Sequence, residues 1–356
     1  MADAAPATLT VTTQLTPAQQ DEVVALVERA ATHDGHRAVN DAGLLALRKN
    51  SSGDSTGDSI GEASRPGPIH VLAHGAGPGS AAALLGYAQA IWEDDGPVAA
   101  LVVDPEHRRQ GIGSALWRTL AERTAALSGD SLRVWATGNT PAAQALAASQ
   151  GLRAIRTLLV LGRSLDGDLP PVEPPAGITI RTFRPTQPDD PDRSDESERP
   201  DESDQSDDID GWLQVNSRAF ASHPEQGSMT RADFEQRMAE PWFDPAGLFL
   251  AVRSIQTDSA EHEEIIGFHW TKREPGAATG EVYVIGVDPT AGVRGLGTPL
   301  LGAGLRHLRD TGAAAVDLYV EADNVPALSL YRRYGFSPLT SDVMYAAPVN
   351  RTDGLG

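Results

Sequence analysis

Two stretches of the chain combine glycine with arginine in an order that could hold a phosphate group. The first is Arg108-Arg109-Gln110-Gly111-Ile112-Gly113, and the second is Gly292-Val293-Arg294-Gly295-Leu296-Gly297. Each follows an apolar run that ends in Asp-Pro and precedes a segment with helical periodicity. Glycine lets the backbone approach a ligand closely, and the first N–H groups of a helix have no partner within that helix. Such a loop can bind a pyrophosphate group through its main chain, aided by the helix dipole.

The spacing of the glycines argues against two other phosphate-binding loops. A Rossmann fold would need a third glycine in G-x-G-x-x-G and an acidic residue about 20 positions later. A P-loop would need Gly-Lys followed by Ser or Thr. Neither stretch offers that third glycine or the Gly-Lys pair. For one stretch alone, an ordinary glycine turn would be the simpler interpretation.

The chain contains an internal repeat. The segment from Ala100 to Ser114 recurs from Val284 to Thr298, at an offset of 184 residues. A second pair of landmarks, Asn139…Gly151-Leu152 and Asn324…Gly335-Phe336, recurs at an offset of 184 or 185. Two landmarks at a nearly constant spacing predict a duplicated domain.

Both copies predict the same order of elements: a helix, antiparallel strands, a strand that leads through the glycine loop into a helix, a further strand and a last helix. The segments are 16–35, 69–73, 84–91, 98–103, 112–127, 132–137 and 142–149 in the first copy, and 211–220, 248–252, 265–272, 281–287, 296–310, 315–320 and 325–334 in the second. This order predicts an α/β fold. We expect an N-terminal domain at 1–168, a proline-rich linker at 169–178 and a C-terminal domain at 179–350.

The net charge of −20 argues against nucleic acid as a partner, because its phosphates would be repelled. Half of that charge lies in residues 189–210, where twelve acidic residues accompany only two arginines. We expect a disordered, solvated insertion at about 187–208 and a flexible loop from Ser51 to Ser64. An interaction tail is the alternative for the acidic segment.

The absence of cysteine excludes disulfides, thiolate metal sites and an acyl-cysteine intermediate. No run of about 18 apolar residues predicts a membrane span, and the first residues lack the features of a secretion signal. No spacing of histidine and aspartate suggests a metal site. We therefore expect a cytoplasmic monomer that uses no metal and binds no membrane.

The loop at Arg108–Gly113 matches the R/Q-x-x-G-x-G/A motif of the GNAT superfamily of acetyltransferases, and the distal segment from Asn324 through Tyr331 to Phe336 resembles the rest of its cofactor site. The resemblance implies two tandem GNAT domains, each a mixed, mostly antiparallel sheet flanked by helices, with acetyl-CoA as co-substrate. Gly292 stands where the motif has Gln or Arg. Because the phosphate contact in this class is mostly main chain, we expect weakened rather than abolished binding in the second copy. The residues that the resemblance assigns to acetyl-CoA are Leu101, Val102, Val103, Arg109, Gln110, Gly111, Ile112, Gly113 and Ser114 in the first copy, and Ile285, Gly286, Val287, Gly292, Val293, Arg294, Gly295, Leu296, Gly297, Thr298, Asn324, Val325, Pro326, Ala327, Leu328 and Ser329 in the second.

Amine acetylation needs a base for the ammonium and an acid for the leaving thiolate. Glu281 begins the strand before the second loop, and Tyr331 lies where the superfamily often carries its thiolate-protonating tyrosine. At the repeat offset, the first copy has Pro97 and Ala147, which can do neither. We therefore predict catalysis in the C-terminal domain, and cofactor binding without catalysis in the N-terminal one. The plainer interpretations are a surface acid for Glu281 and a packing tyrosine for Tyr331.

Several strings in the second half resemble the mycothiol synthases, a family of tandem GNAT enzymes. They are NSRAFASHPEQG, WFDP, GFHWTK, GEVYVIGVDP and LYVEADN. That family transfers acetyl from acetyl-CoA to the cysteine amine of cysteinyl-glucosaminyl-inositol, a small thiol-sugar. By motif, the substrate contacts are Asp41, Glu225, Lys272, Glu281 and Tyr319.

The resemblance implies direct transfer in a ternary complex. Glu281 acts as the base, a backbone N–H near Val287 stabilises the oxyanion, and Tyr331 protonates the thiolate. His269 is expected to be a packed histidine rather than a ligand. Two alternatives stay open: a tandem acetyltransferase for another amine, such as an aminoglycoside or a protein N-terminus, and a regulatory module that binds acyl-CoA without turnover.

Overall fold

The computed structural model describes residues 7–35, 38, 39, 43, 47, 66–75, 83–93, 95–128, 131–185, 208–221, 224–256 and 261–347. Asp41, the expected loop at 51–64 and the acidic segment up to residue 207 lie outside the described residues. The chain divides into two compact units. The first contains residues 1–158 and 340–356, and the second contains residues 159–339.

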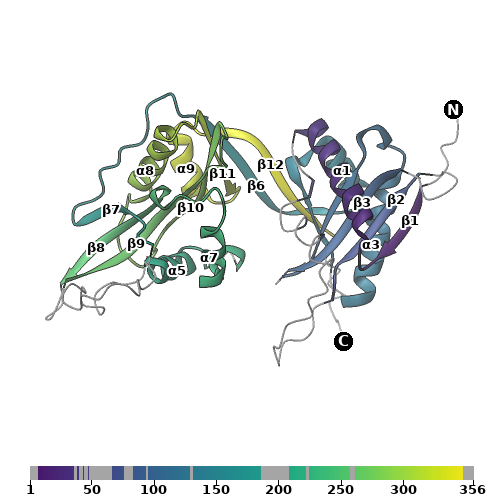
Figure 1. Cartoon of the computed structure of the whole chain (residues 1–356), viewed down its shortest axis with the longest axis horizontal. Helices are drawn as coiled ribbons and strands as arrows, with labels where there is room; N and C mark the ends of the chain where they lie inside the picture. Colours follow the sequence, from purple (N-terminus) through teal and green to yellow (C-terminus); the bar gives the residue numbers. More distant parts are fainter. Residues whose placement is uncertain are drawn as a thin grey trace, which may run out of the picture. The chain divides into compact units, whose positions relative to one another are not determined.

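The first unit is a sheet with helices on both of its faces (Figure 1). Its strand order is β1-β2-β3-β4-β5-β12. Helix α1 packs on the face that carries Leu72 and Tyr87, and helix α3 packs on the face that carries Val71 and Ala88. The bounds are β1 (Thr8–Thr12), α1 (Pro17–Asp34), β2 (Ile69–His74), β3 (Leu84–Glu93), β4 (Gly96–Val103), α3 (Ile112–Ser128), β5 (Arg133–Ala136), α4 (Pro141–Ser149) and β12 (Ser337–Ala346).

The second unit repeats this arrangement, with the strand order β6-β11-β10-β9-β8-β7. Helices α8 and α9 lie on one face of its sheet, and α5 and α7 lie on the other (Figure 1). The bounds are β6 (Arg153–Ser164), β7 (Ile178–Thr182), α5 (Asp208–Ala219), α6 (Pro224–Gly227), α7 (Arg231–Met238), β8 (Leu248–Gln256), β9 (Glu261–Lys272), β10 (Thr279–Val287), α8 (Gly297–Asp310), β11 (Ala315–Glu321) and α9 (Val325–Arg333). The predicted α/β fold, built twice, is confirmed.

The last strand of the chain belongs to the first unit. Residues Val343–Ala346 of β12 pair antiparallel with Arg133–Ala136 of β5. From Leu159 onward, β6 belongs to the second unit, although it follows the last helix of the first copy. The units therefore differ from the expected domains 1–168 and 179–350, because each copy gives its final strand to the other unit's sheet.

The proline-rich segment expected as a linker at 169–178 packs on the second unit. Arg306 of α8 donates from Nη1 to the carbonyl oxygen of Pro170 at 2.5 Å. Gly302, one turn earlier, permits this approach, because a Cβ there would lie 2.6 Å from that oxygen and 2.7 Å from the oxygen of Pro171. The segment is thus part of the surface of the second unit.

Local signals explain where the helices begin. Thr16 and Gln19 form a capping box at the start of α1, with Oγ1 of Thr16 accepting from the Gln19 amide at 3.3 Å. Asp208, the last residue of the expected acidic insertion, is buried at the start of α5. Arg181 donates to both carboxylate oxygens of Asp208, at 2.7 and 2.6 Å, and the backbone N–H of Arg184 donates to Oδ2 at 2.8 Å. A paired, hydrogen-bonded carboxylate can be buried in this way.

Candidate active site

In each unit, two adjacent parallel strands separate after a short stretch of pairing. In the first unit, β4 and β5 pair only at Val98↔Arg133 and Ala99↔Val134. In the second unit, β10 and β11 pair from Thr279↔Ala315 to Glu281↔Asp317. Beyond these pairs the strands part, and each opening lies beside the glycine loop that follows β4 or β10.

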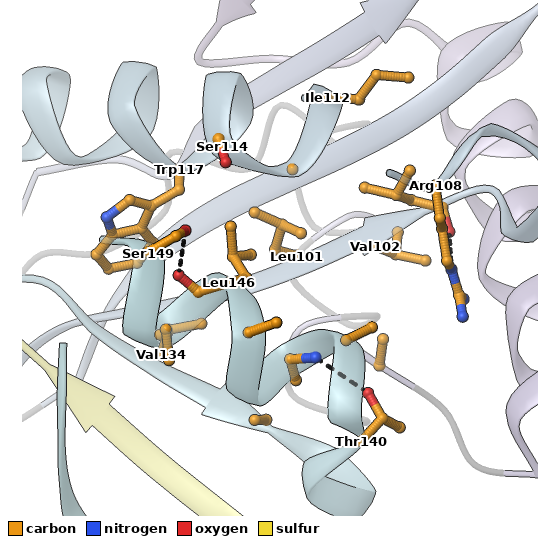
Figure 2. A pocket seen from close by; sticks show the side chains of 18 of the residues that line it. Leu101, Val102, Arg108, Ile112, Ser114, Trp117, Val134, Thr140, Leu146 and Ser149 are labelled. Carbon is orange, nitrogen blue, oxygen red and sulfur yellow. Dashed lines mark hydrogen bonds between the residues drawn. The ribbon is translucent and has the colours of Figure 1, made fainter. Parts of the chain in front are cut away.

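The opening in the first unit holds a cavity of about 410 Å³. Strands β4 and β5 form its floor, and the start of α3 and the length of α4 form its walls (Figure 2). The N–H groups in the first turn of α3 have no partner within the helix, so they can bind an anion there. Apolar strands next to a main-chain anion site fit a ligand with an apolar arm and a phosphate, as acetyl-CoA has.

The cavity contains most of the residues predicted to bind the cofactor in the first copy. Gln110 is exposed and is not among the lining residues. The predicted residues that do line the cavity are Leu101, Val102, Val103, Arg109, Gly111, Ile112, Gly113 and Ser114. Sequence reasoning missed the wall from α4, including Thr140, Ala143 and Ala147. The signal was available, because the matching segment of the second copy, Asn324–Ser329, was assigned to the cofactor.

The charges of the first loop are not all available to a phosphate. Arg108 donates from Nη1 and Nη2 to Asp34 at 2.8 and 2.7 Å, and from Nε to the carbonyl oxygen of Val103 at 3.1 Å. The hydrogen bond from Arg108 lowers the pKa of Asp34, so this pair stays charged at neutral pH. Arg109 adopts a left-handed backbone with φ of 66°, which is unusual for a residue with a side chain.

A carboxylate–arginine pair anchors the Asp-Pro junction in both units. Asp104 accepts from Arg29 of α1 at 3.1 Å and from the backbone N–H of Glu106. Asp288 accepts from Arg218 of α5 at 2.8 Å and from the backbone and hydroxyl of Thr290. Burial raises the pKa of Asp288, but these hydrogen bonds and the Arg218 charge outweigh burial and lower it overall. Neither arginine was predicted, because the two lie on helices far from the loops in sequence.

The second loop uses glycine where the backbone is left-handed. Gly292 and Gly295 have φ of 70° and 81°, so Gly292 replaces an arginine of the motif without strain. At the start of α8, a Cβ on Gly297 would lie 3.3 Å from Leu330 of α9. A Cβ on Gly113 would lie 3.6 Å from Leu146, the equivalent residue of α4. The two loops thus meet their distal helices in the same way.

The predicted cofactor residues of the second copy lie around the opening between β10 and β11. Ile285, Gly286 and Val287 end β10, Gly292–Gly295 form the loop, and Leu296–Thr298 begin α8. Asn324 caps α9, accepting from the Ala327 amide at 3.1 Å, and Val325–Ser329 form the first turns of that helix. Thr140 caps α4 in the same manner. Thr140 therefore matches Asn324, and the pairing of Asn139 with Asn324 at an offset of 185 is wrong.

A β-bulge changes which residue of the first unit matches Glu281. In β10, Val282 pairs with Thr271 and Val284 with Trp270, so Tyr283 is an extra residue. Strand β4 pairs with β3 without such a shift. Glu281 pairs with Lys272 and Asp317, and the equivalent pairing in the first unit places Val98 between Ile91 and Arg133. The counterpart of Glu281 is thus Val98 rather than Pro97, and it is again unable to accept a proton.

Tyr331 and Glu281 lie on opposite faces of the sheet. Tyr331 packs among the residues of the α8–α9 face, with its ring 5.5 Å from that of Phe336. Val282 belongs to the same cluster, so the preceding residue, Glu281, points to the α5–α7 face. Burial raises the pKa of Tyr331, which keeps its phenol protonated. The equivalent position in the first unit is Ala147, which lines the cavity.

The predicted substrate residues lie in different surroundings. Lys272 lies opposite Glu281, 3.3 Å from Glu274 and 5.3 Å above the ring of Trp242. Tyr319 is 55% exposed on β11. Glu225 lies in α6, where the structure describes its backbone. Among the described residues, no group of three or more His, Asp or Glu side chains could hold a metal ion. None of the helices in the described ranges is long and apolar enough to cross a membrane.

His269 is a packed histidine, as expected from the sequence. It is fully buried on β9, and its Nδ1 lies 2.8 Å from the carbonyl oxygen of Leu300. Because a carbonyl only accepts, Nδ1 carries the proton. A Cβ on Gly304 would lie 2.1 Å from Cε1 of His269, so the glycine makes room for the ring.

Comparison with known proteins defines the class. The model of the Acetyltransferase (GNAT) family matches residues 59–152 and 210–336. A GCN5-related N-acetyltransferase from Sphaerobacter thermophilus shares the fold with a TM-score of 0.60 at 22% identity, covering 95% of each chain. A tandem GNAT protein from the clavulanic acid biosynthesis pathway has a TM-score of 0.59 at 19% identity, covering 96% of this chain and 99% of its own. The chain is a member of the GNAT family of acetyltransferases.

Similar proteins identify the subgroup of the GNAT family to which the chain belongs. The mycothiol acetyltransferase of Thermomonospora curvata is 43% identical over 337 residues, covering 94% of this chain and 95% of that protein. The protein of the same name from Streptomyces coelicolor is 43% identical over 335 residues, covering 93% of each. Within the GNAT family, this chain belongs to the mycothiol acetyltransferases. It is an acetyl-CoA-dependent N-acetyltransferase that acts on a small molecule, as the resemblance implied.

Proposed function

We propose that the chain transfers an acetyl group from acetyl-CoA to the cysteine amine of cysteinyl-glucosaminyl-inositol. The relatives named mycothiol acetyltransferase support this acceptor. The structural observation that carries the proposal is the end of the β10–β11 pairing. There Glu281 lies beside the opening and opposite Lys272, with Tyr331 across the sheet. The first unit has apolar residues at all three matching positions: Ile91, Val98 and Ala147.

Glu281 and Tyr331 transfer protons from opposite faces of the sheet. The acceptor arrives as an ammonium ion, and Glu281 takes one of its protons, directly or through water. The free amine attacks the thioester carbon within the opening between the strands, forming the C–N bond while a backbone N–H near Val287 stabilises the oxyanion. The C–S bond then breaks, the nitrogen loses a second proton, and Tyr331 donates one to the sulfur. With the tyrosine reprotonated, the products are the amide, the CoA thiol and one proton.

The first unit is proposed to bind acetyl-CoA without turning it over. Its cavity has the loop, the helix N-terminus and the apolar floor, but lacks a base at Val98 and an acid at Ala147. The protein is proposed to be a monomer that works in the cytoplasm. Its partner is the thiol-sugar, and neither nucleic acid nor a membrane is proposed as a partner.

Steady-state turnover of the cysteinyl acceptor tests the roles. Glu281→Gln and Tyr331→Phe should each lower kcat by about 10²-fold or more, because each removes a group that moves a proton in the reaction. Tyr334→Phe is the matched control on the adjoining helix end, and it should leave kcat unchanged. Unchanged turnover in Glu281→Gln and Tyr331→Phe would remove both roles. Absence of wild-type turnover with this acceptor would remove the proposed substrate.

A further inference from the structure

Strand β11 carries a second carboxylate next to the proposed base. Glu281 and Asp317 form the last pair before β10 and β11 separate. Residues opposite each other on neighbouring strands share a face, and the strands lie about 4.8 Å apart. Lys272 occupies the matching position on β9. Lys272, Glu281 and Asp317 thus form a row across three strands, with a cation at one end and two carboxylates at the opening.

Among the residues that the structure describes, Asp317 has no counter-ion of its own. It is half-buried, and within the residues that the structure describes no arginine or lysine forms an ion pair with it. Lys272 pairs with Glu274 and lies over Trp242. Burial raises the pKa of Asp317, which means that the site holds this negative charge at a cost. A bound cation would offset that cost.

The first unit supports a functional interpretation of this residue. The position that matches Asp317 is Arg133, in register with Val98. Arg133 donates to the carbonyl oxygen of Gly96 at 3.1 Å and lies 3.8 Å from Asp95. The same place in the fold therefore carries an arginine beside Asp95 in the unit without the base. In the unit with the base it carries a carboxylate that forms no ion pair with a described arginine or lysine. The fold itself does not require an acid at this point.

We propose that Asp317 binds the ammonium group of the acceptor together with Glu281, and so makes this site select an amine that arrives charged. The inference rests on the proposed function. The ammonium lies between the two carboxylates, Glu281 takes the proton, and Asp317 holds the amine in line with the opening. After acetylation the nitrogen is neutral and this attraction is lost, which favours release of the product.

Binding of substrate and product to Asp317→Asn tests the proposal. The test compares, by calorimetry, the affinities for the cysteinyl acceptor and for its N-acetylated product, which differ in the charge at one nitrogen. Asp317→Asn should weaken the acceptor by about 10-fold and the product by less than about 2-fold, because only the acceptor loses a charge partner. KM for the acceptor should rise to match, with kcat changed by less than about 3-fold. Asp317→Glu should restore most of the affinity.

The controls separate this role from a structural one. Asp310→Asn makes the same charge change on an exposed residue of α8 and should alter neither affinity. Asp317→Asn should unfold at the same temperature as the wild type or higher, because it removes a half-buried charge that forms no ion pair within the described residues. Equal weakening of acceptor and product, or no weakening of either, would overturn the role of Asp317. Failure of the wild type to bind or acetylate the acceptor would instead overturn the proposed function.

Discussion

The buried His269 predicts a loss of stability in mild acid. Burial lowers its pKa from 6.5 to about 4, against the opposing effect of the Leu300 carbonyl. The unfolded chain binds a proton at this residue near pH 6.5, whereas the folded protein does not until near pH 4. The folded pKa is the lower one, so the stabilising contribution is complete above pH 6.5 and is lost as the pH falls toward 4.

The pKa difference gives the magnitude. Each unit of pKa corresponds to about 1.4 kcal/mol, so the loss is about 2 kcal/mol at pH 5 and about 3 kcal/mol at pH 4. His70 of the first unit has the same linkage, because burial lowers its pKa to about 4 as well. Its ring lies 2.6 Å from the hydroxyl of Tyr87, which donates to Gln89. Within the described residues, each unit therefore carries one buried histidine that must stay neutral.

Urea unfolding at pH 7.5 and pH 5 measures the effect, with His269→Gln as the test variant. The glutamine amide can still donate to the Leu300 carbonyl but does not titrate. Between the two pH values, the free energy of unfolding of the wild type should fall by about 2 kcal/mol more than that of the variant. His70→Gln should remove a similar share in the first unit. An equal fall in the wild type and His269→Gln would refute the linkage, whatever the variant's stability at pH 7.5.

Three further predictions follow from the loops and the insertion. Arg218→Met should raise KM for acetyl-CoA about 3- to 10-fold in steady-state assays, since Asp288 loses its anchor to α5, while Arg309→Met changes the same charge on the surface with no effect. Gly111→Val places a β-branched residue at a left-handed φ of 83° and should prevent acetyl-CoA from binding to the first unit. Calorimetry should then show acetyl-CoA bound to the second unit alone, and turnover should be retained. Loss of turnover would contradict the proposal that only the second unit is catalytic. Replacing residues 187–206 with a short Gly-Ser linker should keep kcat within about 2-fold. The Arg184 amide and the Asp208 carboxylate, which flank the replaced segment, already lie 2.8 Å apart, so a short linker can join them. A large drop in kcat would show that the acidic segment takes part in turnover.

The sequence predicted the fold because the repeat and its local signals are short-range. The capping box at Thr16, the glycine loops and the periodic segments each lie within a few residues, so their patterns are visible without a structure. Strand exchange could not be predicted in this way. Strands β6 and β12 carry the same pattern whichever sheet they join, and only three-dimensional pairing shows that β12 meets β5.

In the site as well, short-range features could be predicted from the sequence and long-range ones could not. The glycine loops and the motifs around Glu281 and Tyr331 are contiguous in sequence, so they could be recognised without a structure. The bulge at Tyr283 was invisible, so Glu281 was matched to Pro97 instead of Val98. The arginines that anchor Asp104 and Asp288 were missed because long-range ion pairs leave no spacing signal.

The site of acetylation on the acceptor tests the central claim most directly. The wild-type protein is incubated with acetyl-CoA and cysteinyl-glucosaminyl-inositol, and the product is located by tandem mass spectrometry with the thiol blocked beforehand. We predict one acetyl group on the cysteine nitrogen with the wild type, and a rate lower by about 10²-fold or more with Glu281→Gln. Acetyl groups on sulfur or on a sugar hydroxyl, or full transfer to nitrogen by Glu281→Gln, would contradict the proposed reaction.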